Sequence, residues 1–356
     1  IHELDGIPLA IELAASRTVH LPPTTLHERL RERFKLLGGA RRDHGDRQAT
    51  LWGLINWSWT LLKSWEQAAL AQLSVFRDGF SLESAEAVLE LSEWPEAPWV
   101  LDVIGTLLDK SLLHSREVLD QPRFSIYLSV RDFAAHKLDE CDPTEETRRR
   151  FATHFAEQST ESAILALAQH GGTRRQKLLA TDLDNCLAAA EYGIQSNDAA
   201  LATGCALAAV LVLQNSGPFI TGVELLDRVL HLPGLGDVDR FRLLEAVGEL
   251  KYYAGKFPDA QTYLDPALEQ ARLLQDPRLE GRALNLLGAV CHRRGQLVQS
   301  RIYMNQALTL AIEHQIPEIE RRSRRNLAVL HKETQTSKDC LHILQDILRF
   351  SREQGD

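Results

Sequence analysis

Apolar residues recur at helical spacing along most of the chain, and one short stretch breaks that period. Leucines and tryptophans recur every three or four positions from 51 to 62, and the pattern repeats over 66–76. Ser81 is a suitable N-cap for a third helix, with acidic Glu83 and Glu86 near its positive end. A fourth helix is predicted over 99–108. The pattern therefore predicts four helices before any strand.

The period changes after the fourth helix. Two short β-prone runs, 111–117 and 123–128, are separated by a polar turn at Asp120, Gln121 and Pro122, which predicts a hairpin. Helical spacing returns over 130–138. Helices followed by a small hairpin indicate a winged-helix domain, to which we assign residues 41–140.

Two further segments flank this domain. Before it, the spacing predicts a short apolar helix over 9–16 and a second helix that begins near Thr24 or Thr25 and ends at 34. After it, residues 141–200 keep helical spacing with a break at Gly171 and Gly172, so we interpret them as a helical linker.

An internal repeat occupies the last third of the chain. Five identities recur at an offset of 40 residues, and a degenerate third copy and an earlier copy extend the series to about four helical hairpins. The matched pairs are Gly248 and Gly288, Gly255 and Gly295, Tyr263 and Tyr303, Ala267 and Ala307, and Leu268 and Leu308. Small residues suit the close approach of two helices, and Gly255 and Gly295 are expected in turns.

Composition limits the classes of function. The formal net charge is -9 with mixed signs along the chain, which disfavours binding to a nucleic-acid backbone. The five cysteines are odd in number and widely spaced, which favours a reducing compartment over a disulfide framework or a zinc site. No run of about 18 apolar residues occurs, because the apolar stretch from Ala199 to Leu213 stops at Gln214 and Asn215, and no signal peptide is visible. We expect a cytoplasmic protein without a membrane role.

The repeats resemble the tetratricopeptide family over residues 201–356. In the best copy the pattern falls on Leu244, Gly248, Gly255, Phe257, Ala260, Leu264 and Ala267. The repeat is longer than the usual length of about 34 residues. The resemblance implies an α-solenoid, so the expected fold class is mainly α: a winged-helix module with a small β-hairpin, followed by helical hairpins.

The first half resembles bacterial signal-transduction ATPases of the NB-ARC or STAND type, many of which are transcriptional regulators. The run Gly6, Ile7, Pro8, Leu9, Ala10 is similar to their Gly-Leu-Pro-Leu-Ala element. Four blocks follow in the order of their winged-helix domain: Thr50–Leu51 with Trp57–Ser58 and Leu61–Leu62, Phe76 to Ala85, Leu107 to Leu112, and Val130 to Ala134. The chain begins at Ile1, and its one methionine is Met304. We therefore expect residues 1–40 to be the end of an ATPase domain and the chain to be the carboxyl-terminal part of a larger protein.

The resemblance implies nucleotide contacts only at this first run. Gly6, Pro8 and Leu9 would lie near the adenine of ATP or ADP, bound with Mg²⁺ in the intact protein, whereas the alternative for Pro8 is that it simply starts a helix. A histidine that many relatives supply to the diphosphate corresponds to Tyr127. No G-x-x-x-x-G-K-[ST] sequence occurs, so we expect this chain alone to hold no cofactor and to be no enzyme.

Other chemistry has weaker support. No metal-ligand or nucleophile motif is present. The tryptophans at Trp52, Trp59 and Trp65 suit core packing, and a carbohydrate or base-stacking site is the alternative. A winged helix can bind DNA, but the candidate recognition helix carries Asp102 and Asp109 against Lys110 only, so a mechanical role is favoured over direct nucleic-acid binding.

The repeats are the predicted ligand surface. The first helix of each hairpin would present cations and an amide to an acidic peptide, a protein or a small anionic inducer, unless these side chains form an ordinary solvated face. The candidate residues are Arg282, Asn285, His292, Arg293, Arg322, Arg325 and Lys332. The expected function is that of a sensing arm that acts on an upstream ATPase domain in cis, with possible self-association on activation. The alternative is a tetratricopeptide scaffold without a nucleotide switch.

Overall fold

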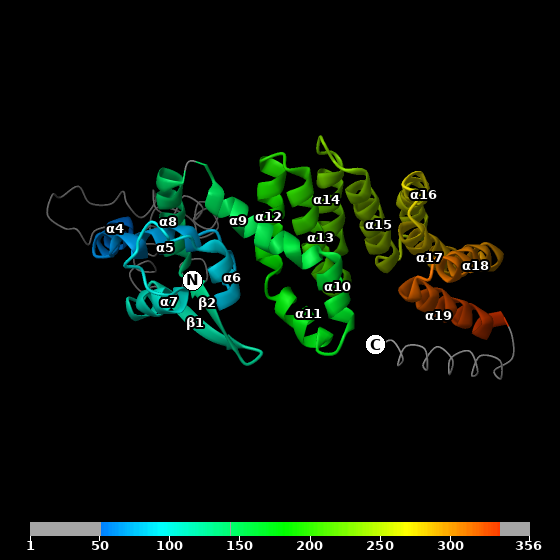
Figure 1. Cartoon of the computed structure of the whole chain (residues 1–356), viewed down its shortest axis with the longest axis horizontal. Coiled ribbons are helices and arrows are strands. Elements are labelled where there is room, and N and C mark those ends of the chain that lie inside the picture. Colours follow the sequence, from blue (N-terminus) through cyan, green and yellow to red (C-terminus); the bar gives the residue numbers. More distant parts are fainter. Residues whose placement is uncertain (1–50, 143, 335–356) are drawn as a thin grey trace, which may run out of the picture. The chain divides into compact units, whose positions relative to one another are not determined.

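The computed structural model describes residues 51–142 and 144–334, and these form two compact units that divide within one helix, between His154 and Phe155. The first unit combines helices with a two-stranded antiparallel hairpin (Figure 1). Its elements are α4 (Leu51–Thr60), α5 (Ser64–Leu73), α6 (Leu82–Val88), α7 (Val100–Asp109), β1 (Leu113–Val118), β2 (Gln121–Ile126), α8 (Leu128–Cys141) and most of α9 (Glu146–Ala156). The prediction of helices, a small hairpin and a further helix is confirmed.

The second unit is helical throughout its described residues. Figure 1 shows α12 to α19 following one another as successive neighbours, and each packs against the next. The elements are η3 (Glu157–Ser159), α10 (Glu161–Ala168), α11 (Gly172–Ala180), α12 (Leu183–Gln195), α13 (Ala199–Ser216), α14 (Phe219–Leu230), α15 (Asp237–Tyr253), α16 (Phe257–Leu273), α17 (Pro277–Arg293), α18 (Leu297–Glu313) and α19 (Pro317–Thr334). This arrangement confirms the predicted helical solenoid. The segment 141–200 is divided between the two units, and its larger part lies with the repeats.

Side-chain caps fix several helix starts. The Ser81 hydroxyl accepts a hydrogen bond from the Ser84 N–H at 3.1 Å, as predicted for the start of α6. Asp198 caps α13 in the same way, and Asp276 caps α17 by accepting from two backbone N–H groups. Each cap satisfies backbone donors that a helix leaves unpaired at its first turn.

The hairpin turns earlier than predicted. Leu113 pairs with Ile126 and Val118 with Gln121, so the turn consists of Leu119 and Asp120, both with positive φ. The expectation that Gln121 and Pro122 lie in the turn is wrong, because the two-residue left-handed turn is complete before them. Likewise, residue 128 begins α8 rather than ending the strand.

The loop before α6 holds the hairpin in place. Phe80 and Phe124 exchange two backbone hydrogen bonds, at 2.8 and 2.9 Å. The buried guanidinium of Arg123 donates to the carbonyl of Gly79 at 3.0 Å. Gly79 has φ +92° and leaves no room for a Cβ, which would lie 2.5 Å from the Phe124 carbonyl oxygen. This close approach explains why the Phe-x-x-Gly-Phe-Ser block needs glycine.

Aromatic side chains form the core of the first unit. Phe133 is fully buried and packs edge-on against Trp52 at 4.8 Å and Trp59 at 5.7 Å between ring centroids. Trp65 is 4% exposed. The prediction that these three tryptophans serve packing is therefore confirmed.

Glycines allow the helices of each repeat to approach closely. A Cβ on Gly248 of α15 would lie 2.6 Å from Leu264 of α16, and one on Gly288 of α17 would lie 2.8 Å from Met304 of α18. The turns after α15 and α17 contain Gly255 and Gly295, with φ +73° and +74°. Both predicted roles of the repeat glycines are confirmed.

Among the helices of residues 51–142 and 144–334, α13 is long and apolar enough to span a membrane, by length and composition only. In α13, 61% of the 18-residue window is buried inside the protein. The helix packs against α12 and α14 and against η3. Its apolar composition is thus that of a core helix in the repeat unit.

Candidate functional site

Three arginines occupy the same position in successive repeats. Arg242, Arg282 and Arg322 lie in α15, α17 and α19, the first helices of their hairpins, at intervals of 40 residues. We call these three residues the arginine ladder. The ladder places a guanidinium at equivalent points of consecutive hairpins, as a repeated structure requires.

The middle member of the ladder forms an ion pair with a buried carboxylate. Arg282 donates two hydrogen bonds to the carboxylate of Glu245 in α15, from Nε at 2.9 Å and from Nη2. The Glu245 side chain is 6% exposed, whereas that of Arg282 is 38% exposed. The carboxylate of Glu245 and that of Glu249 raise the pKa of Arg282 further above its usual value, against the opposing effect of burial.

The last member reaches past its neighbour. Arg322 of α19 lies 3.8 Å from the carboxylate of Glu249 in α15, so the contact spans two hairpins. Glu249 also accepts a hydrogen bond from the Tyr253 hydroxyl at 3.3 Å. Burial raises the pKa of Glu249, while Arg322 acts in the opposite direction. Burial also raises the pKa of Tyr253 to about 12, with the Glu249 carboxylate adding to the effect.

The first member and a nearby arginine extend the contacts to the start of the second unit. Arg242 donates to the Ser159 carbonyl in η3 at 2.6 Å. Arg278, which precedes the ladder position in α17, pairs with Glu161 of α10 and, at 3.1 Å, with Glu318 of α19. The first helices of the hairpins and the α10 region therefore share one charged face.

The amide predicted as a ligand is part of the core. Asn285 is 0% exposed and donates to the Gly281 carbonyl at 3.1 Å and to the Ser323 hydroxyl at 2.9 Å. Asn326 donates to the Asn285 amide oxygen at 3.3 Å. The expectation that Asn285 projects to a ligand is wrong, because its amide joins α17 to α19 instead.

The other residues predicted to bind a ligand differ in exposure and location. Arg293 and Arg325 are exposed on α17 and α19, and His292 is partly buried. Lys332 lies in α19, and Gly6, Pro8 and Leu9 lie outside the described residues. The pairing of Arg282 with the buried carboxylate of Glu245, and of Arg322 with the partly buried carboxylate of Glu249, could not be predicted from the cations alone. The sequence feature that could have indicated these pairs is the presence of two acidic residues, Glu245 and Glu249, one helical turn apart in α15.

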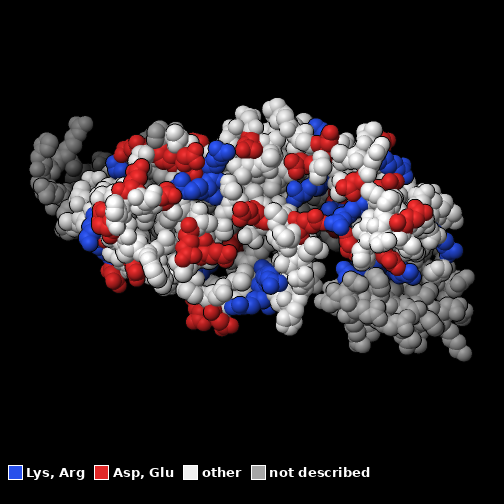
Figure 2. Space-filling model, in the orientation of Figure 1, with Lys and Arg blue, Asp and Glu red and all other residues white. Residues whose placement is uncertain are grey.

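Charges of both signs alternate on the surface of the repeats. On the face drawn in Figure 2, blue and red side chains are interspersed over the molecule. No group of three or more histidine, cysteine or acidic side chains within residues 51–142 and 144–334 could hold a metal ion. The repeat face is therefore suited to polar protein contacts that exchange one ion pair for another.

In the first unit, the lysine that follows the candidate recognition helix is engaged in an ion pair with a buried glutamate. Lys110, which follows α7, donates to the carboxylate of Glu66 at 2.6 Å, and Glu66 is 1% exposed. The same Glu66 carboxylate accepts from the Lys63 N–H at 2.7 Å at the start of α5. Lys110 thus stabilises the packing of α7 on α5 and is not presented to a phosphate.

Comparison with known proteins agrees with the repeat assignment. A family model described as tetratricopeptide repeat matches residues 239–313, which run from α15 to the end of α18. The match lies within the region that the sequence assigns to helical hairpins. The chain therefore contains tetratricopeptide repeats.

Two relatives from Mycobacterium tuberculosis extend the comparison. An uncharacterized protein is 36% identical over 152 residues, which cover 43% of this chain and 39% of that protein. A protein named "Putative HTH-type transcriptional regulator" is 28% identical over 298 residues, which cover 80% of this chain and 33% of that protein. The chain thus spans well under half the length of these curated relatives.

One solved structure aligns with most of the chain. It is the crystal structure of a Signal Transduction ATPase with Numerous Domains (STAND) protein with a tetratricopeptide repeat sensor from Pyrococcus horikoshii, with 15% identity and a TM-score of 0.38. The alignment covers 97% of this chain and 61% of that one. Residues 239–313 of the chain thus match a tetratricopeptide repeat model, and 80% of the chain is similar to a protein named as a transcriptional regulator.

Proposed function

We propose that this chain is the sensing and coupling part of a STAND-type, ATP-dependent transcriptional regulator. The observation that carries the proposal is the similarity to a named regulator over 80% of the chain, a share too large for either the first unit or the repeats to supply alone. The ordered sequence blocks of the first unit support the same class. ATP or ADP with Mg²⁺ would be bound by an ATPase domain in the same polypeptide, in the cytoplasm.

Residues in and next to these sequence blocks make contacts that hold the elements of the first unit together. Such contacts suit a rigid coupling element. Gly79 and Arg123 fix the hairpin, and Lys110 with Glu66 fixes α7 on α5. A rigid module can transmit a displacement, whereas a loosely packed one would absorb it. The role proposed for the winged helix is accordingly mechanical.

The repeats would bias the nucleotide switch by binding a protein partner better in one state than in the other. A ligand shifts a conformational equilibrium only through such a difference in affinity. The exposed Arg293 and Arg325 remain the best candidates for contact with acidic groups of that partner. A partner that used Arg282 would first have to displace Glu245.

The test is ADP release from the full-length protein. Release of a fluorescent ADP analogue is measured for the intact protein and for a variant that ends at residue 156, the end of α9 and just past the boundary of the first unit, with ADP binding itself as the control for a folded ATPase domain. We expect the release rate to change by about tenfold, which corresponds to a difference of about 1.4 kcal/mol in the activation free energy of release. Equal rates would favour the scaffold alternative, and a gene without a P-loop upstream of Ile1 would refute the proposal.

A further inference from the structure

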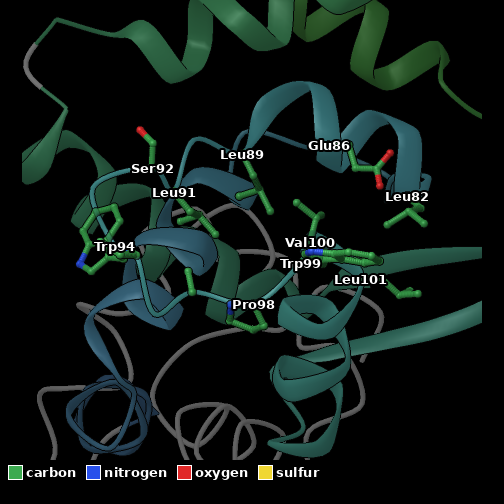
Figure 3. A pocket seen from close by; sticks show the side chains of 12 residues that line it. Leu82, Glu86, Leu89, Leu91, Ser92, Trp94, Pro98, Trp99, Val100 and Leu101 are labelled. Atoms are coloured by element: carbon green, nitrogen blue, oxygen red, sulfur yellow. The ribbon is translucent and has the colours of Figure 1, made fainter.

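The connection between α6 and α7 forms an apolar pocket on the first unit that the proposed function does not use. The pocket has a volume of about 570 Å³ and is lined mainly by leucine, proline and tryptophan side chains. Figure 3 shows the Trp99 ring edge-on, with Glu86 and Leu82 on one side of it and Leu101 on the other. Trp99 is 85% exposed and Leu101 54% exposed. Apolar side chains this exposed are typical of contact surfaces.

Hydrogen bonds from the core hold this connection in place. The Gln72 side chain of α5 donates to the Glu90 carbonyl at 2.9 Å and accepts from the Glu90 N–H at 2.7 Å. Arg150 of α9 donates to the Val88 carbonyl at 2.9 Å. Because all three bonds are made with side chains from helices of the same unit, the pocket is formed before any ligand arrives. A preformed pocket has a low ordering cost on binding.

The pocket lies in a strongly acidic stretch of the chain. Residues 80–109 contain seven carboxylates and no lysine, arginine or histidine: Glu83, Glu86, Glu90, Glu93, Glu96, Asp102 and Asp109. All seven residues are exposed. Glu90 accepts from the Ser92 N–H. No ion pair neutralises any of the seven within the part of the chain that the structure describes. Of these seven, Glu86 lines the pocket and Glu96 lies between the lining residues Pro95 and Ala97, so negative charge borders the apolar centre.

This combination selects the chemistry of a partner. Nucleic acids and anionic membranes are repelled by the carboxylates. A cation attached to an apolar body can place its charge near Glu86 and over the face of Trp99, where cation–π attraction adds to the ion pair. An amphipathic helix provides several such groups together, with apolar side chains along one face and basic ones beside them.

We propose that this pocket is a docking site for a basic amphipathic segment of a protein partner. One apolar side chain of the segment would pack against Trp99 and Leu101. Flanking lysine or arginine side chains would lie near Glu86 and Glu96. The site is distinct from the repeat face and does not depend on nucleotide binding.

The probe is a synthetic 14-residue peptide of leucine and lysine with helical spacing, labelled and titrated with the full chain by fluorescence anisotropy. Its controls are the same peptide with glutamate for lysine and with alanine for leucine. The Glu86→Lys/Glu96→Lys chain should bind the basic peptide at least about tenfold more weakly, because two attractive contacts become repulsive. Trp99→Ala should weaken binding by about tenfold, and Trp99→Phe should restore part of the loss.

Glu117→Lys/Glu140→Lys is the matched control, because it also reverses two exposed carboxylates of the same unit, on β1 and α8, and both lie outside the pocket lining. It should leave the dissociation constant within about twofold. Circular dichroism of each variant shows whether the first unit remains folded. Equal binding of the acidic and basic peptides, or equal binding by the wild-type and Trp99→Ala chains, would overturn the proposal. Displacement of the basic peptide by arginine amide at the same molar concentration would overturn it too, since a small cation would then suffice.

Discussion

The guanidinium of Arg282 in α17 and the carboxylate of Glu245 in α15 form a two-bond ion pair in which only the arginine retains substantial contact with water. The two partners are therefore unequal. Removing the arginine leaves a buried carboxylate without a counter-charge, whereas removing the acid leaves a guanidinium that water can reach.

Arg282→Gln is consequently expected to destabilise the repeats by about 3 kcal/mol. Glu245→Gln should cost about 1 kcal/mol, in the range of an ordinary hydrogen bond. Urea unfolding of the repeat unit, followed by circular dichroism, measures both. Arg272→Gln serves as the control, because its ion pair with Glu280 is exposed and should contribute less than about 1 kcal/mol. Equal losses for the two partners would contradict the asymmetry.

A second prediction concerns the helix contacts within a hairpin. Gly248→Ala should destabilise the repeats by about 1–3 kcal/mol, because the new methyl group would overlap Leu264. Gly105→Ala is the comparison, since Gly105 lies within α7 and has open space at its Cβ position. That change should stabilise the first unit by up to about 1 kcal/mol through helix propensity. Thermal unfolding should show a lower melting temperature for Gly248→Ala and an unchanged or higher one for Gly105→Ala, each relative to the wild-type protein.

Glu249 predicts a pH dependence. Its pKa is raised in the folded state by burial, so the folded protein holds its proton more tightly than the unfolded chain. The cost of the buried charge is therefore largest above the raised pKa and is relieved as the pH falls toward the ordinary carboxyl value of 4.5.

Glu249→Gln removes this titration. We expect the melting temperature of the wild-type protein, measured relative to that of the variant, to rise as the pH is lowered from 7 toward 4.5. Taking the difference between the two proteins cancels the titration of the remaining groups. A difference that is constant with pH, or that changes in the opposite direction, would show that Arg322 outweighs burial at this site.

Thiol reactivity provides a fourth prediction. Cys186 and Cys205 are buried in α12 and α13, and burial raises the pKa of both thiols, that of Cys205 to about 12. Cys141 is exposed at the end of α8. Alkylation of the native protein at pH 8, followed by peptide mass spectrometry, should label Cys141 well before the two buried residues, because the thiolate is the reactive form. Fast labelling of Cys186 would indicate local opening between α12 and α13.

The sequence predicted those features that depend on local pattern. The 40-residue offset located the hairpins, and Gly255 and Gly295 lie in turns because left-handed backbone favours glycine wherever it occurs. Strand boundaries were less accurate, because Leu119 adopts positive φ although its residue type gives no indication of it. Each strand consequently begins two residues from its predicted start, and the turn has two residues instead of the five between the predicted strands.

The candidate ligand surface was harder to predict, because its state depends on partners in other repeats. Asn285 looks like a polar surface residue in sequence, yet it meets Ser323 in the next hairpin and is buried. Arg282 likewise depends on Glu245, 37 residues earlier. The spacing of residues within one helix predicts on which face of that helix a side chain lies. It does not predict which other helix packs against that face.

The reach of Arg322 to Glu249 has a consequence for how the array loses its structure. In a solenoid whose repeats contact only their immediate neighbours, the terminal repeats can unfold one at a time, because each depends on a single interface. A charge contact from α19 to α15 adds coupling between units that are not adjacent. Loss of α19 therefore also weakens α15, which favours a single sharp transition over gradual fraying and makes this end of the array cooperative with its middle.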